Sequence, residues 1–98
     1  MGGRSIRVLE SAMENIARAA WFIESKGLVA TADRFSESIY DFIEKLSKKN
    51  ISYKLCHEPE RALLGFKCVQ FKKYTIVFEE SDEEITVVEF IPSKLIKW

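Results

Sequence analysis

The chain has 98 residues, of which 47% are hydrophobic and 12% aromatic, so it has enough apolar material for one hydrophobic core and too much for a disordered chain. Fifteen basic residues balance fifteen acidic ones, which argues against the large positive excess typical of non-specific nucleic-acid binding. The longest uninterrupted apolar run, residues 19–23, is far shorter than the roughly 20 residues that cross a membrane.

These features predict a single domain over residues 1–98 with no membrane partner. The N-terminus lacks the apolar stretch of a secretion signal, so we expect the protein in the cytoplasm. Cys56 and Cys68 are the only cysteines, and in that compartment we expect both to be reduced thiols. Together with His57 they fall short of the four ligands of a structural zinc site. We predict neither a metal nor a cofactor.

The first part of the chain follows a helical period. Residues 6–9 are apolar enough for a short opening strand, and Ser11 and Glu14 have the spacing of a capping box that would begin a helix. Gly27 is expected to end this helix. Its buried face is predicted to contain Ala12, Ile16, Ala19 and Ile23, with Trp21 and Phe22 widening it.

The second helix has the clearer pattern. Its apolar residues recur at helical spacing at positions 28, 32, 35, 39, 42, 43 and 46, and Asn50 is expected to terminate it. Tyr40, like Trp21, is expected in the core or at its rim. The short connection at Gly27 predicts an antiparallel pair of helices.

After Asn50 the period changes to two. Tyr53 and Leu55 suggest an edge strand, residues 57–60 a turn containing Pro59, and residues 63–71 a strand broken or bulged at Gly65. Residues 74–79 alternate as a further strand. Residues 84–91 are apolar on both faces and should lie inside the sheet. The expected fold is α+β: an antiparallel helical hairpin packed on a C-terminal antiparallel sheet of three or four strands, with a short N-terminal strand as a further option.

This order of elements resembles the RelE/ParE family of type II toxins across roughly residues 5–94. The match in the second helix consists of Ala32, Phe35, Ile39, Ile43 and Leu46. Phe66 and Lys67 precede the strand of residues 74–78 at the family's distance, and residues 90–94 correspond to its last strand. Lys67 and Lys94 stand where the nucleases of the family carry arginine, and Pro92 stands at the position of a histidine. Lysine keeps the charge of arginine but lacks its planar, bidentate fork.

Basic residues are the candidate partner-binding set. Those on or beyond the strands are Lys67, Lys72, Lys73, Lys94 and Lys97, which would contact phosphates or an acidic antitoxin unless they are simply solvated charges. Arg61 is a second-rank candidate that could instead pair with Glu58 or Glu60. Trp98, at the chain end, could anchor a partner. The pair Cys56 and His57 is a poor nucleophile and base, because neighbouring residues on a strand point to opposite faces.

The resemblance implies a toxin that acts by macromolecular binding, as ParE-like members do on DNA gyrase, and that a cognate antitoxin neutralises. The alternatives are a RelE-like nuclease acting on messenger RNA in the ribosome, with Lys67 and Lys94 stabilising phosphate charge, and an inactive interaction domain on the same scaffold. The unmatched nuclease residues favour a protein without enzymatic activity. The sequence leaves open whether the protein forms a homodimer.

Overall fold

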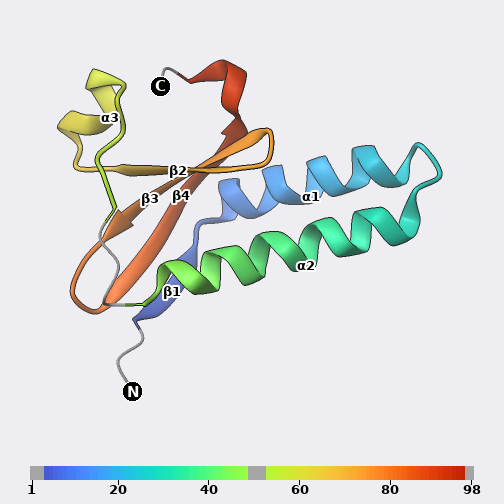
Figure 1. Ribbon diagram of the computed structural model, residues 1–98, viewed down its shortest axis with the longest axis horizontal. Coiled ribbons are helices and arrows are strands. Elements are labelled where there is room, and N and C mark those ends of the chain that lie inside the picture. The colour runs from blue at the N-terminus through green and yellow to red at the C-terminus, as the bar shows by residue number, and fades with distance from the viewer. Residues whose placement is uncertain (1–3, 49–52, 97–98) are drawn as a thin grey trace.

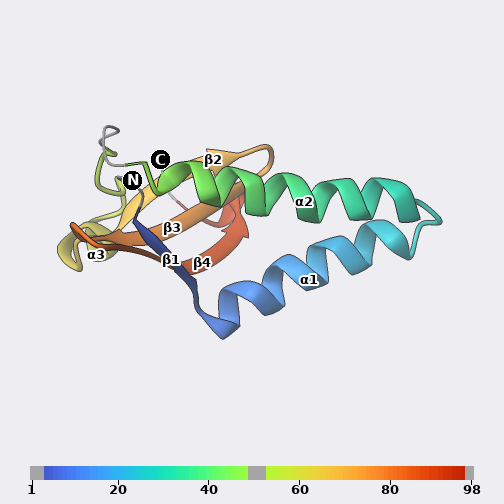
Figure 2. The same ribbon diagram turned by 90° about the horizontal axis from the view of Figure 1, so that it is seen from below.

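The computed structural model describes residues 4–48 and 53–96. Its elements in chain order are β1 (Ser5–Val8), α1 (Glu10–Glu24), α2 (Val29–Leu46), α3 (Pro59–Leu63), β2 (Lys67–Phe71), β3 (Tyr74–Glu80), β4 (Glu84–Pro92) and the short 3-10 helix η1 (Ser93–Leu95). Helices α1 and α2 form an antiparallel hairpin on one side of the sheet, and the distal part of this hairpin projects beyond the strands (Figures 1 and 2). The predicted α+β fold is confirmed.

The four strands lie in the order β1-β4-β3-β2. Strand β4 pairs antiparallel with β3 and parallel with β1, so the predicted short N-terminal strand exists and makes the sheet mixed. As predicted, β4 is an inner strand with apolar residues on both faces. Its Ile85, Val87 and Phe90 pack on the helix side, whereas Val88 and Ile91 pack on the other. The register shifts between Val77 and Phe78 in β3, as in a β-bulge.

The main core lies between the hairpin and the sheet. Gly27 allows the tight connection, since its φ of 82° lies in the left-handed region that glycine adopts without strain. Most of the predicted helical positions are buried here, whereas Leu28 is exposed. The buried residues of this helix-side core are Ala12, Ile16, Phe35, Ile39, Ile43, Leu46, Phe71, Ile76, Phe78, Ile85, Val87 and Phe90.

The predicted capping box is wrong. Helix α1 begins at Glu10, one residue before Ser11, and its N-cap residue Leu9 makes no side-chain hydrogen bond. The Leu9 amide instead donates to the carbonyl of Val87 at 3.0 Å. This bond continues the pairing of β1 with β4, so the chain turns into the helix directly from the strand.

Three aromatic residues predicted for the core or its rim are exposed: Trp21 by 66%, Phe22 by 55% and Tyr40 by 41%. The sheet covers one side of the hairpin and stops short of its tip, so residues near the Gly27 turn have no layer to pack against (Figure 2). Leu28 and Val29 are exposed there as well.

The segment before β2 also differs from the prediction. Pro59 occupies the first turn of α3, where its fixed φ and missing amide are favourable, and Gly65, with a φ of 79°, follows the helix end. Strand β2 therefore begins at Lys67 instead of residue 63. The expected edge strand at Tyr53 and Leu55 is reduced to one bridge between Leu55 and Lys67. Asn50 lies outside the described residues.

Arg4 joins three parts of the fold. Its guanidinium donates to the carbonyls of Leu46 and Lys48 at 3.0 Å and of Ser47 at 3.3 Å, which lie at the C-terminal end of α2. It also forms an ion pair with Glu80, at 2.7 Å, and the Arg4 side chain is only 6% exposed. One side chain thus satisfies carbonyls that a helix end leaves without partners and fixes them to the end of β3.

We predict that Arg4→Ala lowers the free energy of unfolding by about 3 kcal/mol, because it leaves Glu80 and the helix-end carbonyls without their donor. Urea denaturation followed by circular dichroism measures the change. Arg7→Ala, three residues further along in β1 and exposed, is the control and should cost less than about 0.5 kcal/mol. Equal stability of the two variants would contradict the role given to Arg4.

Candidate partner-binding groove

The turn between β2 and β3 carries two lysines next to each other. Lys72 and Lys73 connect Phe71 to Tyr74, which are paired in the ladder, so the connection has only two residues as predicted. Lys72 has a φ of 55°, the only positive φ of a non-glycine residue among residues 4–48 and 53–96. The side-chain amide of Gln70 donates to the Lys72 carbonyl at 3.1 Å and helps to hold this conformation. Residues other than glycine, asparagine and aspartate are uncommon in this left-handed region.

Two adjoining hollows meet at this turn. The first, of about 480 Å³, is lined by Gln70, Lys72, Lys73, Tyr74, Pro92, Ser93 and Lys94. The second, of about 650 Å³, is lined by Phe22, Ile23, Thr31, Arg34, Phe35, Ser38, Lys72, Lys73 and Tyr74. Because they share the turn lysines and Tyr74, we treat them as one feature, called the groove below. It runs between the projecting hairpin and the end of the sheet.

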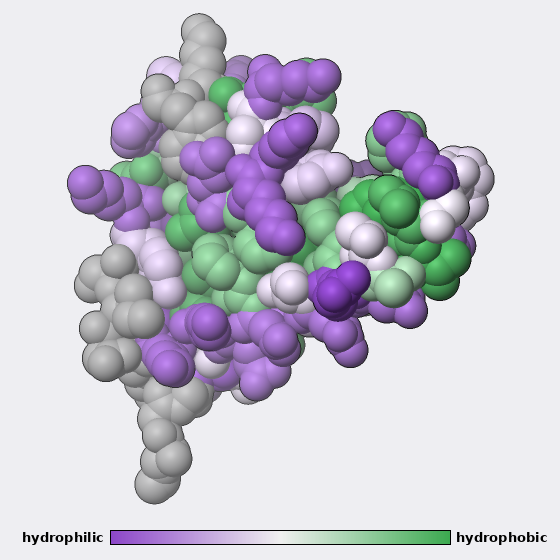
Figure 3. Space-filling model, turned by 45° about the vertical axis from the view of Figure 1, so that its right-hand side comes forward, coloured by the Kyte–Doolittle hydropathy of each residue, from purple (hydrophilic) through white to green (hydrophobic). Residues whose placement is uncertain are grey.

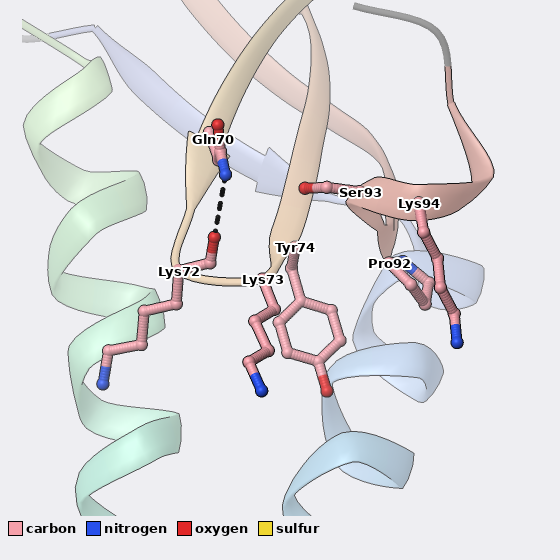
Figure 4. A pocket seen from close by; sticks show the side chains of 7 residues that line it. All are labelled: Gln70, Lys72, Lys73, Tyr74, Pro92, Ser93 and Lys94. Carbon is pink, nitrogen blue, oxygen red and sulfur yellow. Dashed lines mark hydrogen bonds between the residues drawn. The ribbon is translucent and has the colours of Figure 1, made fainter.

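The groove combines apolar walls with cationic edges. Phe22, Ile23 and Phe35 line the helix side, and Arg34, one helical turn from Ser38, adds a cation from α2. In the close view, the amines of Lys72, Lys73 and Lys94 and the hydroxyl of Tyr74 all point toward the helical hairpin (Figure 4). The space-filling view shows a hydrophobic surface across the middle of one face with hydrophilic side chains on either side (Figure 3).

The base of the groove is rigid because three aromatic rings pack together there. Tyr74 stacks on Phe90 with ring centroids 4.7 Å apart, and Phe35 meets both rings edge-on at 5.7 and 6.5 Å. Such arrangements are favourable beyond the area that they bury. The triad links α2, β3 and β4, so the helix wall and the strand wall keep their spacing.

The structure brings together three of the predicted lysines, Lys72, Lys73 and Lys94, and separates Lys67 from them. Lys67 begins β2, about 13 Å from the end of that strand at Phe71 by strand geometry. Its ammonium donates to the Tyr53 carbonyl at 2.9 Å and lies 3.7 Å from Glu80. Lys67 and Lys94 therefore do not share a site. Lys97 and Trp98 lie outside the described residues.

Arg61 is part of an ion-pair network on the other face of the sheet. Its guanidinium donates to both carboxylate oxygens of Glu89, at 2.7 and 3.0 Å, and also to Glu58. The hydrogen bond to Glu89 raises the pKa of Arg61. The suggested pairing with Glu58 is thus present, and the bidentate bond to Glu89 fastens α3 to β4.

Sequence reasoning missed the residues that complete the groove, chiefly Arg34, Tyr74 and Phe22. Thr31, Arg34, Phe35 and Ser38 recur at intervals of three, one and three residues, so they occupy one side of α2. This spacing could have placed Arg34 beside the buried Phe35. Phe22 could not have been found in this way, because its exposure depends on where the sheet ends.

The other notable polar surface is acidic. Glu79, Glu80, Ser81, Glu84 and Thr86 line a small hollow at the turn between β3 and β4. Over residues 4–48 and 53–96, no group of three or more acidic, histidine or cysteine side chains has the geometry to hold a metal ion. Within the same ranges, no helix has both the length and the apolar character needed to cross a membrane.

Comparison with known families identifies this chain across nearly its full length. The model of the family described as "ParE toxin of type II toxin-antitoxin system, parDE" matches residues 6–94. The match begins within β1 and ends within η1, and it includes all residues that line the groove. Among curated proteins, no sequence matches the chain.

The backbone at Lys72 leads to a prediction. Lys72→Gly should raise the free energy of unfolding by about 0.5 kcal/mol, because relief of the left-handed conformation exceeds the entropy that glycine loses on folding. Thermal and urea unfolding measure this change. Lys73→Gly, at a position without positive φ, should instead lower the stability by about 0.5–1 kcal/mol. A loss of stability in Lys72→Gly would contradict this account of the turn.

Proposed function

Because the chain belongs to the ParE toxin family of type II toxin–antitoxin systems, we propose that it acts by binding DNA gyrase in the cytoplasm and that its cognate antitoxin neutralises it by occupying the groove. The family match makes the chain a toxin with an antitoxin partner. The target and the position of the antitoxin are our proposal.

The separation of Lys67 from Lys94 is the observation that carries this proposal. A nuclease built on these two lysines would need both ammonium groups near one phosphate. Lys94 lines the groove beside the β2–β3 turn, whereas Lys67 sits at the far end of β2, bonded to Tyr53 and near Glu80. This arrangement supports action by binding over RNA cleavage.

The groove suits an amphipathic, acidic antitoxin helix. Such a helix would lay its apolar side against Phe22, Ile23 and Phe35 and place carboxylates near Arg34, Lys72 and Lys73. The apolar contacts would supply most of the affinity, and the cationic edges would fix the orientation and speed association. The preformed walls of the groove would spare the toxin the entropy of ordering them.

We predict that the purified protein inhibits DNA supercoiling by gyrase and does not cleave messenger RNA during translation. A supercoiling assay and cleavage mapping on translated message measure the two activities in parallel. Addition of the antitoxin should restore supercoiling. Message cleavage that is lost in Lys67→Ala would favour the nuclease instead. Normal growth of cells that express the chain alone would favour an inactive interaction domain.

We predict that Lys73→Glu and Arg34→Glu each weaken antitoxin binding about tenfold, with a smaller effect at high salt, because each reverses a charge at the edge of the groove. Calorimetry with the purified antitoxin measures the affinity. Lys54→Glu is the matched control, since this exposed lysine lies next to Leu55, which pairs with β2 at its opposite end. Equal weakening by all three variants would show that overall charge, not the groove, governs binding.

A further inference from the structure

The face of the sheet opposite the hairpin has a thin covering. Residues 53–66, called the cover segment here, include α3 and pass over this face (Figure 1). None of the five residues of α3 is buried, and Leu63 and Leu64 are 88% and 65% exposed. Cys56, which is 3% exposed, is the buried residue of the segment. Phe66 is half-buried against the same cluster as Cys56, and the ring of Tyr53 meets that of Phe78 edge-on at 5.3 Å. Apolar burial in the segment is therefore confined to its two ends and Cys56.

Cys56 is bonded to Cys68 in β2 by a disulfide, so the prediction of two reduced thiols is wrong for this structure. The two residues are 12 positions apart, and their bond closes a loop that contains α3. Cys56 packs with Val77 and Ile96 in a small second core, and Cys68 lies at its margin. The disulfide is thus the covalent attachment of the cover segment to the sheet.

Polar contacts also attach the cover segment to the sheet. The Cys56 amide donates to the Phe66 carbonyl at 3.0 Å, and Leu55 makes its single bridge to Lys67. Arg61 adds its bidentate bond to Glu89, in which the Arg61 side chain is 21% and the Glu89 side chain 37% exposed. Segments with few buried apolar contacts open at a lower free energy than the core. Loss of the disulfide should therefore change the dynamics of the cover segment far more than those of the sheet.

We propose that the Cys56–Cys68 pair is a redox-sensitive clamp that holds the cover segment on the sheet when oxidised and releases it when reduced by a small thiol or dithiol. The reductant's thiolate attacks Sγ of Cys68, the less buried of the two residues, and the Cys56 thiolate leaves and takes up a proton. A second thiolate then attacks the reductant's sulfur in the mixed disulfide and frees Cys68, which is protonated in turn. Two electrons pass from the reductant, which becomes a disulfide, to the two cysteines.

The clamp is separate from the helix-side core and from the groove. Within the cover segment, only Tyr53, at its start, packs against the helix-side core, and no residue of the segment lines the groove. Reduction should therefore loosen residues 54–66 while the hairpin and the inner strands stay folded. Cytoplasmic disulfides are commonly transient and regulatory, so both states of the clamp would be within reach of a toxin that acts in that compartment.

Hydrogen–deuterium exchange on the purified full-length protein tests the clamp, with dithiothreitol as the reductant. The oxidised protein should show no free thiol on alkylation under denaturing conditions. Reduction should speed amide exchange in residues 54–66 by at least about tenfold and in β3 and β4 by less than about twofold. If both cysteines can still be alkylated after treatment with an oxidant, the disulfide does not form and the proposal is overturned. Equal amide-exchange rates of residues 54–66 in the oxidised and the reduced protein would overturn it as well.

The double variant Cys56→Ala/Cys68→Ala provides the matched control. It should exchange like the reduced protein and show no response to dithiothreitol. A response of the variant to the reductant would contradict the assignment to this pair. The comparison of oxidised with reduced wild-type protein requires no substitution, so it decides the question even if the variant does not fold. The test uses neither gyrase nor an antitoxin and is therefore independent of the proposed function.

Discussion

The packing of Phe35 against Tyr74 and Phe90 is the contact on which the functional surface depends. It joins the middle of α2 to the first residue of β3 and to the far part of β4, at the point where the hairpin leaves the sheet. Because the rings interlock, the helices cannot slide along the strands without losing aromatic contacts. The groove is the space that remains beyond this contact, with Tyr74 forming its base and Lys72 and Lys73 its edge.

The central strand β4 lets a chain of this size support two different surfaces. Its helix-side residues complete the main core, whereas Val88 and Ile91 face the second core under the cover segment. The register shift near Val77 and Phe78 accommodates an extra residue in β4. One face of the sheet thus gains a helical layer and a preformed groove, while the other has a thin layer held by Arg61 and the disulfide.

The parts of the fold that were predictable from sequence are those set by local periodicity. The spacing of Ala32, Phe35 and Ile39 indicated α2, and the double-sided pattern of β4 indicated an inner strand; both are confirmed. The exposure of Trp21 and Phe22 was not predictable, since the helical pattern of α1 contains no information about how far the sheet extends. The pairing of Cys56 with Cys68 depends on how residues 53–66 fold back over β2, a long-range contact that spacing alone does not encode.

The grouping of the lysines at the candidate site was less predictable than the fold, because the net charge of the chain does not show how its charges are distributed in space. The formal net charge is zero, yet β3 runs from the groove with its lysines to the acidic turn at Glu80 and Glu84, a distance of roughly 20 Å by strand geometry. A separation of this size exceeds the screening length of about 8 Å at physiological salt, so the two ends present opposite local fields instead of cancelling. Lys67 lies at the acidic end, where Glu80 balances its charge, and Lys94 at the basic end. A charged partner is therefore attracted to one end of the sheet and repelled by the other. The positions of the lysines along the strands, not their number, determine which of them can act together.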